Sequence, residues 1–154
     1  MSPWWPQNTW RAMRAGVDCP MCADAHLPSN PFGVLVAELS ASYVRLQRNQ
    51  TRPGYCAVIA KDHVPEVHEF DDATLIAFWR DAAAVGRAIE QLFSPVKLDN
   101  LVMGHRCPHV HCHLYPQYPG DDPYRPIDIG DGDRFLSDEE LRPDVDRLAA
   151  QLRG

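Results

Sequence analysis

The chain has 154 residues, of which 45% are hydrophobic and 23% are charged, and its net charge at pH 7 is −6. These values are typical of one folded domain spanning residues 1–154, and they exclude a mostly disordered chain, a collagen and a coiled coil. The acidic balance also argues against non-specific binding to nucleic acid or to an anionic membrane, so neither is expected as a partner.

The sequence gives no indication of export or membrane insertion. It has no apolar run near the ~18 residues of a membrane-spanning helix. Its start, MSPWWPQNTW, lacks the basic and apolar regions of a secretory signal, so a cytoplasmic location is expected. In that compartment the Cys-x-x-Cys pair of Cys19 and Cys22 favours metal binding or redox chemistry over a disulfide framework.

The first part of the chain is predicted to form an irregular segment followed by three strands. Residues 1–32 are rich in proline and are expected to be irregular. The tryptophans of this segment are expected to be packing anchors rather than ligand contacts: Trp4, Trp5 and Trp10. Short apolar or alternating runs predict strands at 33–39, 43–47 and 55–60.

A helix and two further strands are predicted next. Asp71 and Asp72 suit the positive end of a helix that stops at Ser94-Pro95. The apolar face of this helix recurs at steps of three and four residues, at Leu75, Trp79, Ala82, Gly86, Ile89 and Phe93. Strands are predicted at 96–103 and 109–115.

Residues 119–154 are predicted to form a loop and a C-terminal helix. Ser137 and Glu140 are spaced as a capping box at the start of this helix. Pro143 is expected either to kink the helix or to restart it. The order of elements predicts an α+β domain with an antiparallel sheet.

Three histidines, His109, His111 and His113, alternate along the last predicted strand. Because alternate residues of a strand share a face, the imidazoles are expected on one side of the sheet. The residues between them, Val110, Cys112 and Leu114, are expected in the core. The imidazole face suits either a metal site or a nucleophilic histidine that attacks phosphorus. A polar strand face without chemistry is the remaining interpretation.

The sequence around these histidines resembles the histidine triad (HIT) superfamily of nucleotide hydrolases and transferases. HVHCHLY (109–115) fits its pattern of three histidines separated by hydrophobic residues, and Asn100 and Gly104 precede it at the family spacing. Three further segments are similar to family motifs in the correct order: CPMC (19–22), VIAKDHVPEVHEF (58–70) and PQYPGDDP (116–123). The resemblance covers roughly residues 10–127.

The resemblance implies a HIT-like fold, with an antiparallel sheet of about five strands, one central helix and a C-terminal helix. It also implies a nucleotide substrate and a homodimer, and no organic cofactor is expected. The catalytic candidates are His109, His111 and His113. The candidates for substrate binding are Asn100, Arg106 and Gln117.

In the family the middle histidine is the nucleophile, which corresponds to His111. It would attack the α-phosphorus of a nucleoside 5′-phosphate derivative, either a dinucleoside polyphosphate or a nucleoside phosphoramidate or adenylate, and form a nucleotidyl-histidine that water hydrolyses. One ring nitrogen must then carry no proton, so the other must donate its hydrogen, usually to a backbone carbonyl. The resemblance implies that His113 either hydrogen-bonds the phosphate oxygens or assists proton transfer, and that Asn100 lies near the phosphate or sugar.

Zinc-bearing members of the family use two cysteines and two histidines, which correspond to Cys19, Cys22, His63 and His109. This Cys2His2 set is expected to hold a structural zinc ion, because zinc in such sites prefers tetrahedral sulfur and nitrogen ligands. The alternative is a pair of reduced cysteines that pack as small hydrophobic residues.

The chain departs from the family pattern beside the triad. Gln117 stands where the family usually has arginine. Arg106, in the loop before the triad, either replaces that charge at the phosphate or is a solvated loop residue.

Two other functions remain open. One is a metal-dependent hydrolase or oxygenase with its metal on the triad, which the lack of a carboxylate beside the triad disfavours. The other is a non-catalytic nucleotide-binding or zinc-binding adaptor, which the retained His111 disfavours.

Overall fold

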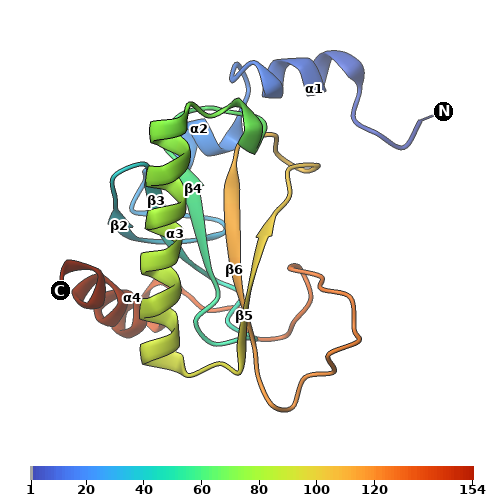
Figure 1. Cartoon of the computed structure of the whole chain (residues 1–154). Helices are drawn as coiled ribbons and strands as arrows, with labels where there is room; N and C mark the ends of the chain where they lie inside the picture. The colour runs from blue at the N-terminus through green and yellow to red at the C-terminus, as the bar shows by residue number, and fades with distance from the viewer. Residues whose placement is uncertain (1) are drawn as a thin grey trace.

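The computed structural model describes residues 2–154, which form a six-stranded antiparallel sheet with the two longest helices on one face (Figure 1). The strands are β1 (Ser29–Asn30), β2 (Gly33–Glu38), β3 (Ser42–Gln47), β4 (Cys56–Ala60), β5 (Lys97–Val102) and β6 (His111–Gln117). Their order across the sheet is β1-β2-β3-β4-β6-β5. The predicted α+β class and antiparallel sheet are confirmed. The sheet has six strands instead of about five because the two-residue β1 pairs with β2 at one edge.

The two faces of the sheet differ in chemistry. On the face toward the helices, Val58 of β4 pairs in register with Cys112 of β6, and both side chains are completely buried in the core. At the next position Ala57 pairs with His113, so these side chains lie on the opposite face. The central strands thus bury one apolar face under the helices and present histidines on the other.

The long helix α3 (Asp72–Phe93) begins and ends where the sequence predicts. The Asp71 side chain accepts a hydrogen bond from the backbone N–H of Thr74 at 2.7 Å, and Ser94 ends the helix in the left-handed conformation. The predicted apolar face is wrong at Trp79, which is 38% exposed. Phe78 is fully buried instead, because its ring packs against Phe70 at a centroid distance of 5.5 Å.

A buried carboxylate ties the middle of α3 to the sheet. Oδ2 of Asp81 accepts two hydrogen bonds of 2.8 Å, one from the backbone N–H of Ala41 and one from the hydroxyl of Ser42. These donors lie in the turn between β2 and β3 and at the start of β3. Asp81 therefore fixes the position of α3 along the sheet and the rotation of the helix about its own axis.

The C-terminal helix α4 (Asp138–Arg153) has the predicted capping box between Ser137 and Glu140. The helix is continuous through Pro143, so the alternative of a restart at that residue is wrong. Pro143 cannot donate a helical hydrogen bond. Burial of Leu141 and Val145 in the core holds the helix together across this position.

The prediction of an irregular segment at 1–32 is wrong. This segment contains α1 (Gln7–Arg14), α2 (Pro20–Asp24) and β1. Figure 1 shows α1 set apart from the sheet, with α2 below it, beside the upper ends of β3 and β4. The expected packing role of the tryptophans holds only in part, because Trp4 and Trp5 are 52% and 41% exposed. Trp4 packs edge-on against Trp10 instead of entering the core.

A 3-10 turn, η1 (Val67–Glu69), connects the loop after β4 to α3. Among residues 2–154, no helix combines the length and the apolar character needed to cross a bilayer.

Candidate active site and metal centre

The three triad histidines occupy two structural settings. His111 and His113 lie on β6, in register with Ile59 and Ala57 of β4, whereas His109 precedes the strand by two residues. All three imidazoles are buried. The strand starts at His111, two residues later than predicted. The carbonyl oxygen of Val110 still accepts from the N–H of Ala60 in β4, but the N–H of Val110 donates to the carbonyl oxygen of Val64, beyond β4.

His111 is held in one tautomer by the backbone. Its Nδ1 donates a hydrogen bond to the carbonyl oxygen of His109 at 2.6 Å. Because a carbonyl oxygen only accepts, Nδ1 carries the hydrogen and Nε2 of the neutral ring keeps its lone pair. Burial, with a smaller contribution from His109, lowers the pKa of His111, so the ring is neutral at pH 7. This is the state that a nitrogen nucleophile requires.

His113 is paired with Tyr55, a residue that the sequence analysis does not single out. The hydroxyl oxygen of Tyr55 lies 2.7 Å from Nδ1 of His113, and both side chains are buried. Burial raises the pKa of Tyr55, so the hydroxyl keeps its proton. Within residues 2–154 this hydroxyl has no second hydrogen-bond partner, so donation to His113 is the arrangement that leaves no buried donor unpaired.

This pairing determines what His113 offers to a ligand. With Nδ1 accepting from Tyr55, the hydrogen of the neutral ring lies on Nε2. Burial, the neighbouring His111 and the charge of Arg106 lower the pKa of His113 to about 3, so the ring remains neutral at pH 7. His113 therefore presents an uncharged N–H donor beside the free nitrogen of His111, and the two ring centroids are 4.8 Å apart.

The structure separates the three candidates for substrate binding. Arg106 is exposed in the loop before His109, and its charge reaches His113. Gln117 ends β6 on the same face as His113. Asn100, on the edge strand β5, pairs in register with Leu114, so it lies on the sheet face that carries the helices, opposite to His113, and it is exposed there. Its role stays a prediction.

Arg52, in the turn before β4, is a second residue that the sequence analysis does not single out. It donates to Oε1 of Gln117 at 3.1 Å and to the hydroxyl of Tyr115 at 2.7 Å, and it forms an ion pair with Asp121. An arginine from another part of the chain thus reaches Gln117, the position at which the family usually has arginine. Arg52, Tyr115 and Gln117 line a cavity of about 340 Å³ that is completed by residues of the 122–133 segment.

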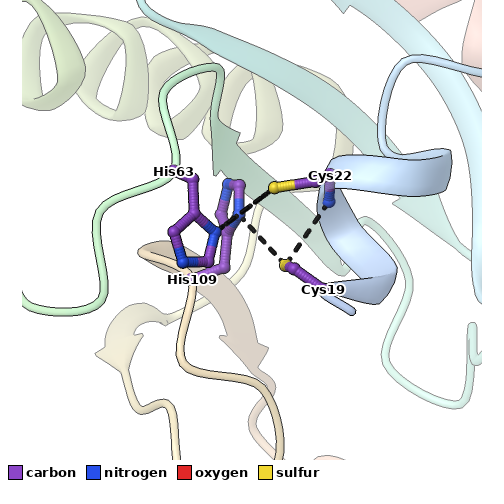
Figure 2. A group of neighbouring side chains, drawn as sticks. All are labelled: Cys19, Cys22, His63 and His109. Carbon is purple, nitrogen blue, oxygen red and sulfur yellow. Dashed lines mark hydrogen bonds between the residues drawn. The ribbon is translucent and has the colours of Figure 1, made fainter. Parts of the chain in front are cut away.

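Four side chains from three separate segments meet beside the end of β4 (Figure 2). Cys19 caps α2 and Cys22 lies in its first turn, while His63 follows β4 and His109 precedes β6. One ligand atom from each residue lies within 4.8 Å of the other three. The structure therefore brings together all four residues that the resemblance implies as zinc ligands.

The two histidines turn unprotonated nitrogens toward this group. Nε2 of His63 donates to the carbonyl oxygen of Arg14 at 2.8 Å, and Nε2 of His109 donates to that of Ala60 at 2.7 Å. In neutral rings both Nδ1 atoms are then acceptors, and they lie 3.2 Å apart. Two lone pairs at this distance repel unless a cation lies between them. Backbone carbonyls that fix the outer nitrogen are also the usual support of metal-binding histidines.

Four of the six distances between these ligand atoms are close to the edges of a zinc tetrahedron, and all six are within 4.8 Å. Nδ1 of His109 lies 3.4 Å from the sulfur of Cys19 and 3.6 Å from that of Cys22, and Nδ1 of His63 lies 3.2 Å from the sulfur of Cys22. A tetrahedron with zinc–ligand bonds of ~2.0–2.3 Å has edges of roughly 3.3–3.8 Å. The donor set and its spacing therefore fit a zinc ion.

Only one triad histidine belongs to the metal-capable group that residues 2–154 form. His111 and His113 lie outside it, and their rings are fixed by the His109 carbonyl and by Tyr55. This arrangement does not gather the triad around a metal ion.

Comparison with known proteins identifies the family. A family model described as "HIT domain" matches residues 32–120, which include β2 to β6, α3 and all three triad histidines. The chain belongs to the HIT family. A curated HIT relative, "Protein hit" of Bacillus subtilis (strain 168), is 30% identical over 100 residues, which span 54% of this chain and 69% of the relative.

Solved HIT structures share the fold. A protein described as a hypothetical histidine triad nucleotide-binding protein from Sulfolobus tokodaii has a TM-score of 0.68 at 20% identity, and the match covers 88% of this chain and 92% of that one. A Zn-bound histidine triad family protein from Mycobacterium smegmatis has a TM-score of 0.64 at 20% identity, with 88% and 96% covered. At these identities the likeness concerns the fold alone.

Proposed function

We propose that this HIT protein is a nucleotide hydrolase or nucleotidyltransferase that cleaves a nucleoside 5′-phosphate derivative at its α-phosphorus. The observation that carries the proposal is the hydrogen bond from Nδ1 of His111 to the carbonyl of His109, which leaves Nε2 of a neutral ring free to attack. Membership of the HIT family supports a nucleotide-related role.

In the proposed reaction His111 and His113 have different tasks. Nε2 of His111 forms a bond to the α-phosphorus while the bond to the leaving group breaks, and the leaving group departs with that electron pair. Nε2–H of His113 donates to a phosphoryl oxygen, on which negative charge develops. Water then cleaves the nitrogen–phosphorus bond, releases the nucleoside monophosphate and restores His111.

The test is intact-protein mass spectrometry after brief mixing with adenosine 5′-phosphoramidate and, separately, with diadenosine tetraphosphate. A nucleotidyl adduct or released AMP is expected for the wild type and not for His111→Gly. The matched control is His68→Gln, an exposed histidine of η1 outside the triad, which is expected to behave like the wild type. If folded wild-type protein forms neither an adduct nor AMP with either compound, the proposal fails for these substrate classes.

The same proposal includes a structural zinc ion held by Cys19, Cys22, His63 and His109. Its support is the facing lone pairs of the two histidines and the fit of the four-atom spacing. Bound there, zinc would cross-link α2 to the loops that flank β4 and β6. Metal analysis of protein purified without chelators tests this directly, and one zinc ion per chain is the expected result.

A homodimer is part of the proposal as well. Its support is that Ile76 and Trp79 of α3 are 52% and 38% exposed, although they belong to the helix that packs on the sheet. Covering this apolar surface would favour association. Light scattering is expected to give twice the mass of the chain, and Trp79→Glu is expected to shift the protein toward the monomer.

A further inference from the structure

A third cysteine, Cys107, lies beside the two cysteines of the metal-capable group. The sulfur of Cys107 is 3.9 Å from the sulfur of Cys19, and both side chains are buried. The two residues are 88 positions apart in the chain, so the fold brings them together. The remaining cysteines outside the group, Cys56 and Cys112, pack in the apolar core under the helices.

Cys107 is a neighbour of the four-residue group rather than a member of it. The group whose ligand atoms all lie within 4.8 Å of one another consists of Cys19, Cys22, His63 and His109. With those four residues bound to a metal, the thiol of Cys107 would stay uncoordinated beside a coordinated sulfur. Cys22 is exposed, so solvent and small solutes reach the group from that side.

We infer that Cys19 and Cys107 form a site of oxidative modification, at which a peroxide joins them in a disulfide and thereby opens the metal site. The inference rests on the proposed zinc site. The peroxide first converts one sulfur to a sulfenic acid and releases water, and the neighbouring thiol then displaces a second water as the sulfur–sulfur bond forms. Two thiols lose two electrons in total, and one peroxide molecule is reduced to two waters.

The disulfide would act on the triad through a single turn of backbone. The N–H of His109 donates to the carbonyl oxygen of Cys107 at 2.9 Å, and the carbonyl oxygen of His109 accepts from His111 at 2.6 Å. Cross-linking Cys107 to Cys19 therefore moves the turn that fixes the tautomer of His111. It also removes Cys19 from the group that orients the His109 ring.

The experiment starts from purified protein with its zinc content measured. Hydrogen peroxide is added in steps, free thiols are alkylated, and unreduced peptides are mapped by mass spectrometry while a colorimetric chelator reports released zinc. The expected result is a Cys19–Cys107 linked peptide that increases in parallel with zinc release. Dithiothreitol is expected to remove the link and to restore zinc binding.

Two variants sharpen this test. Cys107→Ala is expected to bind zinc normally but to give no such link, and its zinc, once released by peroxide, is expected not to return fully after reduction. Cys56→Ala, which removes a core thiol elsewhere, is expected to behave like the wild type. If Cys107→Ala does not fold, the loss of alkylatable Cys107 thiol in the oxidised wild type measures formation of the same disulfide.

Three outcomes would overturn the inference. They are a Cys19–Cys22 disulfide as the main product, a Cys107 that stays fully alkylatable while zinc leaves, and zinc release that is equally reversible in Cys107→Ala. Protein that contains no zinc as purified would instead contradict the proposed metal site. Peptide mapping of that protein after oxidation would still show whether Cys19 and Cys107 form a disulfide.

Discussion

The carbonyl oxygen of His109 accepts a hydrogen bond from Nδ1 of His111 at 2.6 Å, while the ring of His109 belongs to the metal-capable group. One residue thus connects two sites. Its backbone fixes which nitrogen of His111 is free, and its side chain is oriented by Ala60 on one side and by the cysteines on the other. A disturbance of the metal group is therefore expected to reach the nucleophile through His109.

The first prediction concerns the pH dependence of activity. Burial lowers the pKa of His111 below its ordinary 6.5, and the reaction needs the unprotonated ring. Activity is lost when the ring gains a proton, so the acid limb of kcat/KM is expected to have its midpoint below pH 6.5. A pH–rate profile measures this. A midpoint at or above 6.5 would contradict the buried, neutral state of His111.

The second prediction concerns Tyr55→Phe. Removing the hydroxyl leaves Nδ1 of His113 without its donor, so the hydrogen no longer stays on Nε2 and kcat is expected to fall about tenfold, equivalent to about 1.4 kcal/mol. Nitrogen NMR of the ring is expected to show a changed tautomer mixture for His113. Tyr118→Phe is the matched control, because its hydroxyl bonds to the Pro53 carbonyl instead. Equal losses of activity in both variants would argue against a specific role for Tyr55.

The parts of the fold that the sequence predicts well depend on neighbours in the chain. The alternation around His111, the N-cap of α3 at Asp71 and the capping box at Ser137 are each contained within a few residues. Helices α1 and α2 are not predicted. Helix α1 has few apolar side chains, and α2 has only five residues, of which Met21 packs on the distant β4.

The missed site residues depend on partners far along the chain. Tyr55 meets His113 across 58 positions, and Arg52 meets Gln117 across 65. Such pairs follow from strand register and loop path, which a single sequence does not specify. The four metal-capable residues are different, because the motifs that resemble those of HIT proteins already identify them as one group.

The third prediction concerns loss of the metal. His63→Ala removes one of the four proposed zinc ligands, so the zinc bound per chain is expected to fall toward zero and the thermal unfolding midpoint to drop. His68→Ala is the control, since it changes an exposed histidine nearby in the sequence. Brief chelator treatment of the wild type is expected to leave activity intact. Immediate loss of activity would favour a metal that takes part in the reaction.

The fourth prediction concerns the stability of the core. Asp81→Ala leaves the backbone N–H of Ala41 and the hydroxyl of Ser42 without their acceptor, and the free energy of unfolding is expected to fall by about 2–4 kcal/mol. Asp81→Asn retains one acceptor oxygen and is expected to lose less. Asp72→Ala, in the exposed first turn of the same helix, is expected to cost under ~1 kcal/mol. Urea unfolding of the three variants measures the differences.

The fifth prediction concerns Arg106, whose charge contributes to the lowered pKa of His113. If Arg106 contacts the substrate phosphate, Arg106→Ala is expected to raise KM by about tenfold, with a smaller change in kcat. Removing the positive charge also favours the protonated ring, so the pKa of His113 is expected to rise, and NMR titration of the ring detects this shift.

Two controls separate a local role of Arg106 from a general effect of charge. Arg11→Ala removes another exposed arginine, from α1, and is expected to leave both KM and the His113 titration unchanged. Arg106→Lys keeps the charge without the bidentate geometry, so it is expected to restore the pKa but only part of the affinity. If Arg106→Ala moves the pKa but not KM, Arg106 acts on His113 without touching the phosphate.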